Sequence, residues 1–423
     1  MFDLPLFLVQ IIVILIAARA VGWLFQKFHQ PQVVGEMLAG VMLGPSLLGW
    51  LSPDISRYVF PAPSLVFVNA LSQIGMILFM FLVGLELDPK RIASQRRTAL
   101  VISHVSILIP FVLGALVALL LYPRLSDASV PFTQFALFMG VSMSVTAFPV
   151  LARILTERKI LDTEVGSLAI SCAAVDDITA WCILAGVVLL ARSSAQVMPI
   201  WFMLLGTLAF ISVMWLGVRR VLVRIEESFI LQNKIGQGLL GLILLLVFLS
   251  AWVTETLGIH ALFGAFLLGA IMPKESRFVH AVKARLEDIA IVLLLPLYFA
   301  YTGLQTSVGL INSFEMWSYF AVIMIVAMAG KLGGAAVSAH LAGLPWREAT
   351  AIGVLMNTRG LVELVVLNIG LEIGVISPAL YTMMVMMAIA TTLMTTPILD
   401  WVYPGALRQK ISHDPTSPQI KVG

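Results

Sequence analysis

Two adjacent aspartates, Asp176 and Asp177, lie in the middle of the apolar stretch SCAAVDDITAW at 171–181. An ionisable side chain at the centre of a bilayer costs about 2.5–3.5 kcal/mol on insertion scales, so each one requires a reason. Two neighbouring carboxylates cannot both stay ionised cheaply in a dry site, because each disfavours the charge on the other. They must be neutralised by protons, by a metal cation or by a buried base.

Lys331 is the natural candidate for a buried base. It lies in VAMAGKLGGAA at 326–336 and is the only lysine in the interior of an apolar segment. We therefore expect an ion pair between Lys331 and one of the two aspartates. A purely structural pair would need only one carboxylate, so the second one indicates a site that binds a proton or a monovalent cation.

Two apolar segments contain interruptions that favour broken helices. In SVTAFPVLARIL at 144–155, Pro149 removes a helical hydrogen bond and clashes with the preceding turn. In NTRGLVEL at 357–364, polar residues and a glycine weaken the helix. Paired interruptions of this kind point to an ion site made by discontinuous helices, with freed carbonyls and helix ends facing it. The side-chain oxygens expected to support this crossover belong to four residues: Ser144, Thr146, Asn357 and Thr358.

Arg359 and Glu363 are four residues apart in the second interrupted segment. This spacing places them on one helix face, where they can pair and reduce the energetic penalty of burying each other. We expect a structural or gating role for this pair rather than direct transport.

The composition excludes a soluble globular protein. Of 423 residues, 60% are hydrophobic and only 12% are charged, whereas soluble domains have about 45–50% apolar and about 25% charged residues. A membrane-spanning helix needs roughly 20 apolar residues, so the sequence predicts an all-α polytopic membrane protein with about thirteen spans. The expected limits are 5–26, 32–50, 63–87, 98–122, 132–156, 163–191, 197–223, 235–254, 258–273, 285–304, 315–343, 346–370 and 376–402.

The distribution of basic residues predicts the orientation of these spans. Lysines and arginines gather in alternate loops, beginning with the loop after the first span, whereas the other loops hold only Arg57, Arg124 and Arg192. Cytoplasmic loops carry the excess of positive charge. We therefore expect the N-terminus outside and the C-terminus in the cytoplasm, in a plasma (inner) membrane of the bacterial type.

Weak internal repetition relates the two halves of the chain. GVSMSVTA at 140–147 resembles GVLMNTRG at 353–360, and FMFLVGLELD at 79–88 resembles YFAYTGLQTS at 298–307; GEMLAGVMLGP at 35–45 resembles ALFGAFLLGAIMP at 261–273. Each pair is separated by seven spans. An odd separation means that the second copy crosses the membrane in the opposite direction, which is typical of secondary transporters with inverted repeats.

Other sequence signatures exclude several classes of protein. The chain has no GxxxxGK[ST] loop for ATP and no TVGYG-type selectivity filter,. Its basic residues lie in short loops rather than in one stripe, so we expect no nucleic-acid partner. The sequence predicts no enzyme activity and no cofactor, only a lipid bilayer, transported ions and energy from an ion gradient.

The combination of VDDITAW at 175–181, TAFPVLARIL at 146–155, Lys331 and NTRGLVEL at 357–364 resembles the monovalent cation:proton antiporter superfamily. The similarity is greatest to the branch that contains bacterial potassium-efflux antiporters and plant cation/proton exchangers. It covers the chain from about residue 5 to 403. Two features differ from relatives: no acid lies at the break near Pro149, and we expect no nucleotide-binding domain of the kind that glutathione-gated relatives carry.

The resemblance implies roles for the charged residues and an overall organisation. Asp177 would bind the monovalent cation, Asp176 would pair with Lys331, and exchange would be electrogenic. The protein would be a homodimer whose core domain moves like an elevator against a dimerisation domain. The implied division is 1–96 dimerisation helices 1–3, 97–192 core helices 4–6, 193–234 linker helix 7, 235–312 dimerisation helices 8–10, 313–404 core helices 11–13 and 405–423 a short cytoplasmic tail.

Two other functions remain open from the sequence. One is a sodium-coupled symporter of a small organic anion, which the two adjacent acids disfavour. The other is a non-transporting membrane sensor subunit. A relative that had lost transport would more readily have lost Asp177 or Lys331, and both residues are present. The sequence favours Na⁺ over K⁺ as the exchanged cation without deciding between them, because selectivity depends on coordination geometry.

Overall fold

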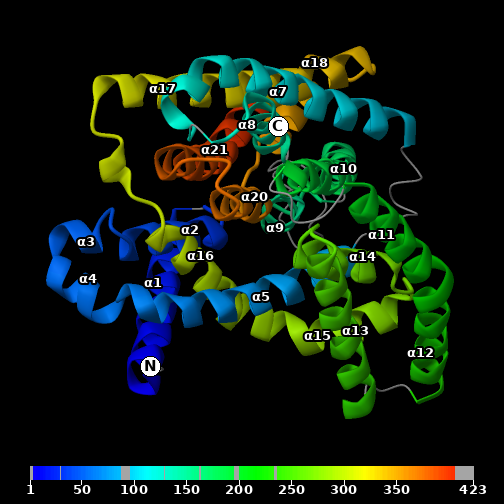
Figure 1. Cartoon of the computed structure of the whole chain (residues 1–423). Coiled ribbons are helices and arrows are strands. Elements are labelled where there is room, and N and C mark those ends of the chain that lie inside the picture. Colours follow the sequence, from blue (N-terminus) through cyan, green and yellow to red (C-terminus); the bar gives the residue numbers. More distant parts are fainter. Residues whose placement is uncertain are drawn as a thin grey trace, which may run out of the picture.

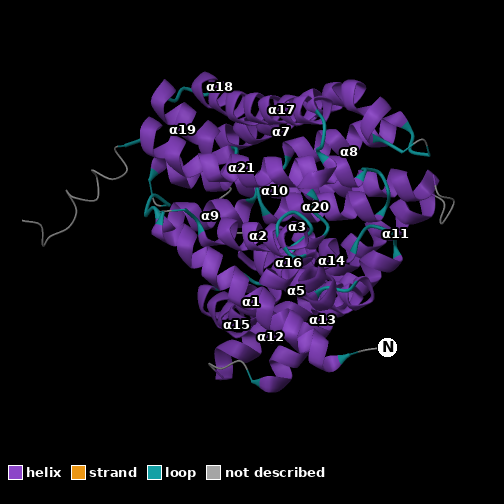
Figure 2. Ribbon diagram, turned by 90° about the vertical axis from the view of Figure 1, so that its left-hand side faces the viewer, coloured by secondary structure: helices purple, strands orange, loops and turns teal. Residues whose placement is uncertain are grey.

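The structure is a computed structural model that describes residues 3–28, 30–86, 96–127, 129–161, 163–194, 200–232 and 236–404. This part of the chain is built from helices and loops and contains no strand (Figure 2). The expected tail at 405–423 lies outside the described residues.

Twenty α-helices follow one another along the described part of the chain. The first half contains α1 (Leu4–Lys27), α2 (Gln32–Leu43), α3 (Leu48–Leu51), α4 (Pro53–Val59), α5 (Leu65–Glu86), α7 (Arg96–Leu125), α8 (Phe132–Ser144), α9 (Phe148–Glu157), α10 (Glu164–Ser194) and α11 (Ile200–Val213). The second half contains α12 (Arg219–Gln232), α13 (Gln237–Thr256), α14 (Ala261–Ile271), α15 (Ser276–Asp288), α16 (Leu295–Leu304), α17 (Phe314–Met328), α18 (Gly334–Leu341), α19 (Trp346–Met356), α20 (Leu361–Glu372) and α21 (Pro378–Val402).

Eleven helical segments of the described residues are long and apolar enough to cross a membrane, and α19 with α20 forms a twelfth candidate bent by 42°. A shorter apolar helix, α14, takes the place of the short ninth segment expected from the sequence. The prediction of an all-α polytopic membrane protein is confirmed, and the spans follow the predicted order.

Both predicted interruptions are breaks in the helical chain. The first lies between Ser144, at the end of α8, and Phe148, at the start of α9; Pro149 occupies the first turn of α9. Proline is tolerated there because the first helical N–H groups lack partners in any case. The second break lies between α19 and α20. The breaks cross, because the backbone N–H of Ala147 donates to the carbonyl of Thr358 at 3.0 Å.

Glycines allow two pairs of helices to cross at close range. A Cβ atom on Gly40 of α2 would lie 2.1 Å from the Phe299 carbonyl oxygen of α16, and one on Gly84 of α5 would lie 2.2 Å from the Phe266 carbonyl oxygen of α14. Small residues permit such close backbone contact between membrane helices. The two crossings join span 2 to span 10 and span 9 to span 3, as the inverted repeat requires.

The helices pack in two groups (Figure 1). In one, α7 packs against α8, α10, α17 and α18, α10 packs against α19, and α17 packs against α21. In the other, α2 packs against α1 and α16, and α14 packs against α5 and α13. Helices α8 and α20 each adjoin one of the breaks. In the view of Figure 1 they lie below α7 and α17 and above α5. The breaks are therefore placed in the interior of the protein.

Candidate functional site

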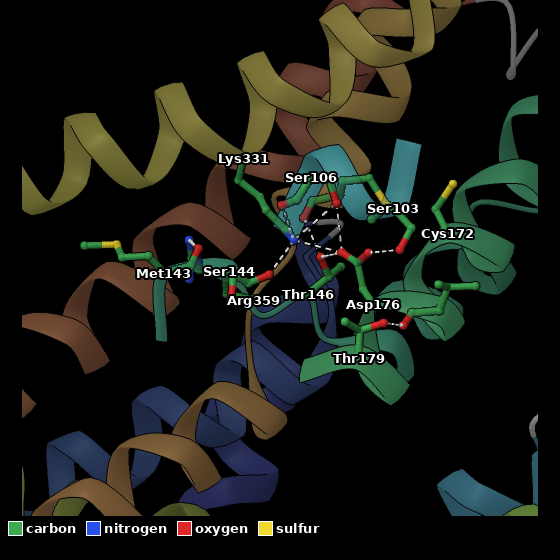
Figure 3. A network of polar contacts seen from close by, with 12 residues as sticks. Ser103, Ser106, Met143, Ser144, Thr146, Cys172, Asp176, Thr179, Lys331 and Arg359 are labelled. Carbon is green, nitrogen blue, oxygen red and sulfur yellow. Dashed lines mark hydrogen bonds and ion pairs between the residues drawn. The ribbon is translucent and has the colours of Figure 1, made fainter. Parts of the chain in front are cut away.

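Lys331 and Asp176 form a fully buried ion pair beside the crossing breaks (Figure 3). The Lys331 Nζ lies 2.8 Å from Asp176 Oδ2 and also donates to the carbonyl oxygens of Ser106 at 3.0 Å and Ser144 at 2.6 Å. Lys331 is the middle residue of a π-helical turn, Ala329–Gly333, between α17 and α18. Such turns are frequent at functional sites because they re-aim a side chain.

Three hydroxyl groups complete the surroundings of Asp176. Ser103 donates to Oδ1 at 2.5 Å, and Ser106 and Thr146 donate to Oδ2 at 3.0 and 2.8 Å. Hydrogen bonds to the ionised form stabilise a buried carboxylate. Sequence reasoning identified Thr146 and missed Ser103 and Ser106. Their three-residue spacing on one face of an apolar helix was the available signal.

Asp177 has different surroundings from its neighbour. Its carboxylate is also fully buried, yet neither oxygen accepts a hydrogen bond of ordinary geometry from the described residues. The backbone N–H of Phe148, in the first turn of α9, interacts electrostatically with it. Asn357 Oδ1 and Thr358 Oγ1, at the second break, are likewise buried without a partner in the described part of the chain. Unpaired buried oxygens are costly unless another group binds them.

The hydroxyl of Ser144 does not face this site as the sequence suggested. It donates to the carbonyl of Val141 in its own helix at 2.8 Å, and only the backbone carbonyl of Ser144 contributes, as an acceptor for Lys331. A serine at a helix end readily bonds to its own backbone. This local bond removes Ser144 Oγ from the set of free oxygens.

Arg359 binds the end of a helix as well as its predicted partner. Nη1 lies 3.0 Å from Glu363 Oε2 and donates to the Ser142 carbonyl at 3.0 Å, and Nη2 donates to the Met143 carbonyl at 2.7 Å. Both charged side chains are fully buried. The four-residue spacing predicted the pair with Glu363. The contact of Arg359 with α8 was not predictable from the sequence, because it depends on how the two segments pack.

Charged side chains compensate the partial charges of the helix ends at the crossing. The C-terminus of a helix carries partial negative charge and its N-terminus partial positive charge. Lys331 and Arg359 bind carbonyls at the C-terminal end of α8, while Asp177 lies at the N-terminus of α9 and Glu363 in the first turn of α20. No acid is needed within the first break itself, because Asp177 of α10 already lies at the N-terminus of α9 and two cations bind the C-terminal end of α8,.

A cavity of about 530 Å³ adjoins the two breaks. Pro149, Val150 and Leu361, next to the two breaks, line its wall, and the charged residues Glu86 and Lys283 line it further away. A cation or proton moving between solvent and the buried aspartates needs such a space. The aspartates themselves remain 0% exposed, so the site is closed.

The sequence matches proteins of one transport family. The sequence profile described as sodium/hydrogen exchanger, transmembrane, matches residues 11–402. The chain is 45% identical over 402 residues to the Na⁺/H⁺ antiporter NhaS4 of Synechocystis sp., covering 95% of this chain and 98% of that protein. It is 41% identical over 407 residues to cation/H⁺ antiporter 17 of Arabidopsis thaliana and 35% identical over 424 residues to K⁺/H⁺ antiporter 1 of Saccharomyces cerevisiae. The chain spans 49% and 48% of the lengths of these last two proteins.

The fold is also similar to a solved structure. The sodium proton antiporter MjNhaP1 from Methanocaldococcus jannaschii, solved at pH 8, superposes with a TM-score of 0.67 over 98% of this chain and 100% of the other. The two sequences are 16% identical. At this level of identity, the likeness establishes a shared fold.

Proposed function

This chain belongs to the sodium/hydrogen exchanger family, and from that premise we propose that it exchanges Na⁺ for protons across the membrane through a site centred on Asp177. The observation that carries the proposal is the contrast between two adjacent carboxylates. Asp176 is ion-paired and accepts three hydroxyl hydrogen bonds, whereas the buried Asp177 carboxylate accepts no side-chain hydrogen bond from the residues that the structure describes. Asp177 is therefore free to bind a proton or a cation in turn.

The charge of the site explains why exchange, rather than leak, would result. Ionised Asp176 and Asp177 with protonated Lys331 carry a net charge of −1, and the Arg359–Glu363 pair adds none. Moving a bare charge through a bilayer is costly. Binding one monovalent cation or one proton removes the excess charge, so the loaded forms cross and the empty form does not. Competition for one carboxylate then couples the two fluxes.

A second proton would make the exchange electrogenic. If an arriving cation displaces Lys331 from Asp176, the lysine can release its proton while the carboxylate joins the coordination of the cation. Two protons would then cross for one cation. The cation-loaded site with neutral Lys331 would carry a charge of −1, whereas the same site without the cation would carry −2, so loading still lowers the charge that crosses. The 2.8 Å pair between Lys331 and Asp176 is the feature that supports this step.

Buried oxygen atoms at the second break are suited to a desolvated alkali cation. Hard cations prefer carboxylate, carbonyl and hydroxyl oxygens, and Asn357 and Thr358 each present a buried side-chain oxygen without a partner among the described residues. We favour Na⁺ because NhaS4, named as a Na⁺/H⁺ antiporter, is similar over nearly its whole length. The yeast relative named as a K⁺/H⁺ antiporter is 35% identical.

We further propose an elevator movement, in which residues 97–192 and 313–404 carry the site past residues 1–96 and 235–312 of a homodimer. The bond between Ala147 and Thr358 supports this division, because it joins both broken helices into one unit. The basic loops support an external N-terminus, a cytoplasmic C-terminus and the plasma membrane as location.

The proposal is tested with purified protein in liposomes that contain a trapped pH dye. Na⁺, K⁺ and Li⁺ are added in turn with the membrane potential clamped by an ionophore for an ion that is not tested. Proton release that follows Na⁺ and responds to voltage is the expected result. Release with K⁺ alone would replace the cation assignment. A flux that is independent of voltage would overturn the second proton, and no release with any cation would overturn antiport.

A further inference from the structure

A buried hydrogen-bonded cluster joins α20 and α21 to α16. Asn368 Nδ2 donates to the Tyr298 hydroxyl at 2.7 Å and to Thr302 Oγ1 at 2.9 Å, both on α16. The hydroxyl of Tyr381, on α21, faces Asn368 Oδ1 at 2.8 Å and the Thr302 carbonyl at 3.2 Å. Tyr298, Thr302 and Tyr381 are at most 3% exposed. Both donors and the acceptor of the partly buried Asn368 amide are therefore used in one network with three buried residues.

The cluster lies between the site and a second cavity. This cavity has a volume of about 490 Å³ and is lined by Asn69 and Gln73 of α5, by Gln305 and by Asn368 and Glu372 of α20. The first cavity is lined by the other ends of the same two helices. It reaches the chain breaks directly, whereas Asn368 is eight residues beyond Gly360, about 12 Å along α20 at 1.5 Å per residue.

The hydrogen bonds resist any sliding of α20 along α16. Separating the two helices would leave the amide and hydroxyl groups of the cluster without their protein partners, which is energetically unfavourable for the buried hydroxyls. The second cavity already places polar side chains, including Glu372, at the outer edge of the cluster. Water entering from this cavity would replace the lost bonds once the helices have moved.

We propose that Asn368 and Tyr381 are positioning residues for the exchange, whose hydrogen bonds to α16 close the site toward the Glu372 cavity and break when the site opens there. The proposal rests on the proposed antiport, because a site that never changes access needs no such closure. It assigns the two residues no contact with the transported ion. Substitution of Asn368 or Tyr381 should therefore change how often the site opens toward the Glu372 cavity.

The test measures access to Met76 in lipid nanodiscs. Met76 is fully buried on α5, on the face of Asn69 and Gln73, and lies between the residues that line the two cavities. Met76→Cys is introduced with Cys182→Ser, because Cys182 is exposed and Cys172 is buried. Labelling with a charged maleimide is then compared with and without Tyr381→Phe. This change keeps the ring and removes one hydroxyl donor, so labelling should become about 2- to 10-fold faster.

A second tyrosine provides the matched control. The Tyr122 hydroxyl donates to the Val130 carbonyl at 2.6 Å, at the junction of α7 and α8, and so takes no part in the hydrogen bonds between α16 and α20. Tyr122→Phe should leave the labelling of Met76→Cys unchanged, and Asn368→Ala should accelerate it as Tyr381→Phe does. Unchanged labelling in Tyr381→Phe, or equal acceleration by Tyr122→Phe, would overturn the proposal. The labelling needs no ion flux, so it separates failure of this inference from failure of antiport.

Discussion

The Nζ atom of Lys331 lies 2.6 Å from the carbonyl oxygen of Ser144, the last residue of α8, and 2.8 Å from Asp176 Oδ2. One ammonium group therefore binds a helix end and a carboxylate at the same time. A cation that draws Asp176 away leaves Lys331 still hydrogen-bonded to backbone carbonyls, although these stabilise its charge less than a carboxylate does. The lysine is thus held in place in both states.

Replacing Asp177 by asparagine should abolish exchange. Asparagine keeps the size of the side chain but can neither take up a proton nor supply a negative charge for a cation. The measurement is the cation-dependent proton release from proteoliposomes. Asp54→Asn, an exposed aspartate in α4, is the control and should behave as the parent protein. Wild-type flux from Asp177→Asn would exclude Asp177 as the ion carrier.

Lys331→Gln should lower both stability and voltage dependence. Removing one partner of a buried ion pair costs about 3–5 kcal/mol, because the remaining charge is unpaired. Thermal unfolding in detergent should therefore begin at a lower temperature, and Asp176→Asn in the same chain should recover part of the loss. Exchange that survives should no longer respond to membrane potential. A double variant no more stable than Lys331→Gln would show that the two residues do not act as a pair.

Lower pH should weaken the apparent affinity for the cation. Protons and cations compete for Asp177, so protonation removes the site that the cation binds. Each unit decrease in pH should raise the apparent KM for Na⁺ about tenfold where cation binding displaces one proton, and about a hundredfold where it also displaces the Lys331 proton. Flux is measured over a series of Na⁺ concentrations at several pH values, equal on both sides at the start. A KM that does not change with pH would contradict competition at one carboxylate.

Arg359→Leu should destabilise the protein strongly, whereas Glu363→Gln should keep exchange. The leucine leaves the Ser142 and Met143 carbonyls and the Glu363 carboxylate without their shared donor, a loss of about 3–5 kcal/mol,. Thermal unfolding measures the first effect, with Arg57→Leu on the exposed surface as control. Abolished flux in a stable, folded Glu363→Gln protein would assign Glu363 a part in transport.

The sequence predicted the features that depend on residue type and local spacing. The breaks follow from Pro149 and from the polar run at 357–360, because these residues destabilise a helix wherever it lies. Arg359 and Glu363 pair as their spacing suggested, although Arg359 lies in the break before α20 and not on the helix that carries Glu363. The repeat offset correctly paired the glycine-rich spans, since an inverted repeat carries each contact of one half into the other.

Other features depend on distant segments and were not predictable from local patterns. Ser103 and Ser106 become ligands of Asp176 only because α7 packs against α10. The contact of Arg359 with α8 arises where two segments more than 200 residues apart cross. Nothing in the sequence around Asn368 predicts its hydrogen bonds with Tyr298 and Tyr381, because these residues belong to other helices.

The hydrogen bond from the Ala147 amide to the Thr358 carbonyl joins main chain to main chain. Side-chain substitution at either position leaves both bonding groups in place, and only proline at position 147 removes the donor. The two halves of the chain are thus connected by a backbone hydrogen bond that persists when the side chains at both positions are substituted. The segments GVSMSVTA and GVLMNTRG could therefore diverge until their common pattern is barely visible, while the bond between them persisted.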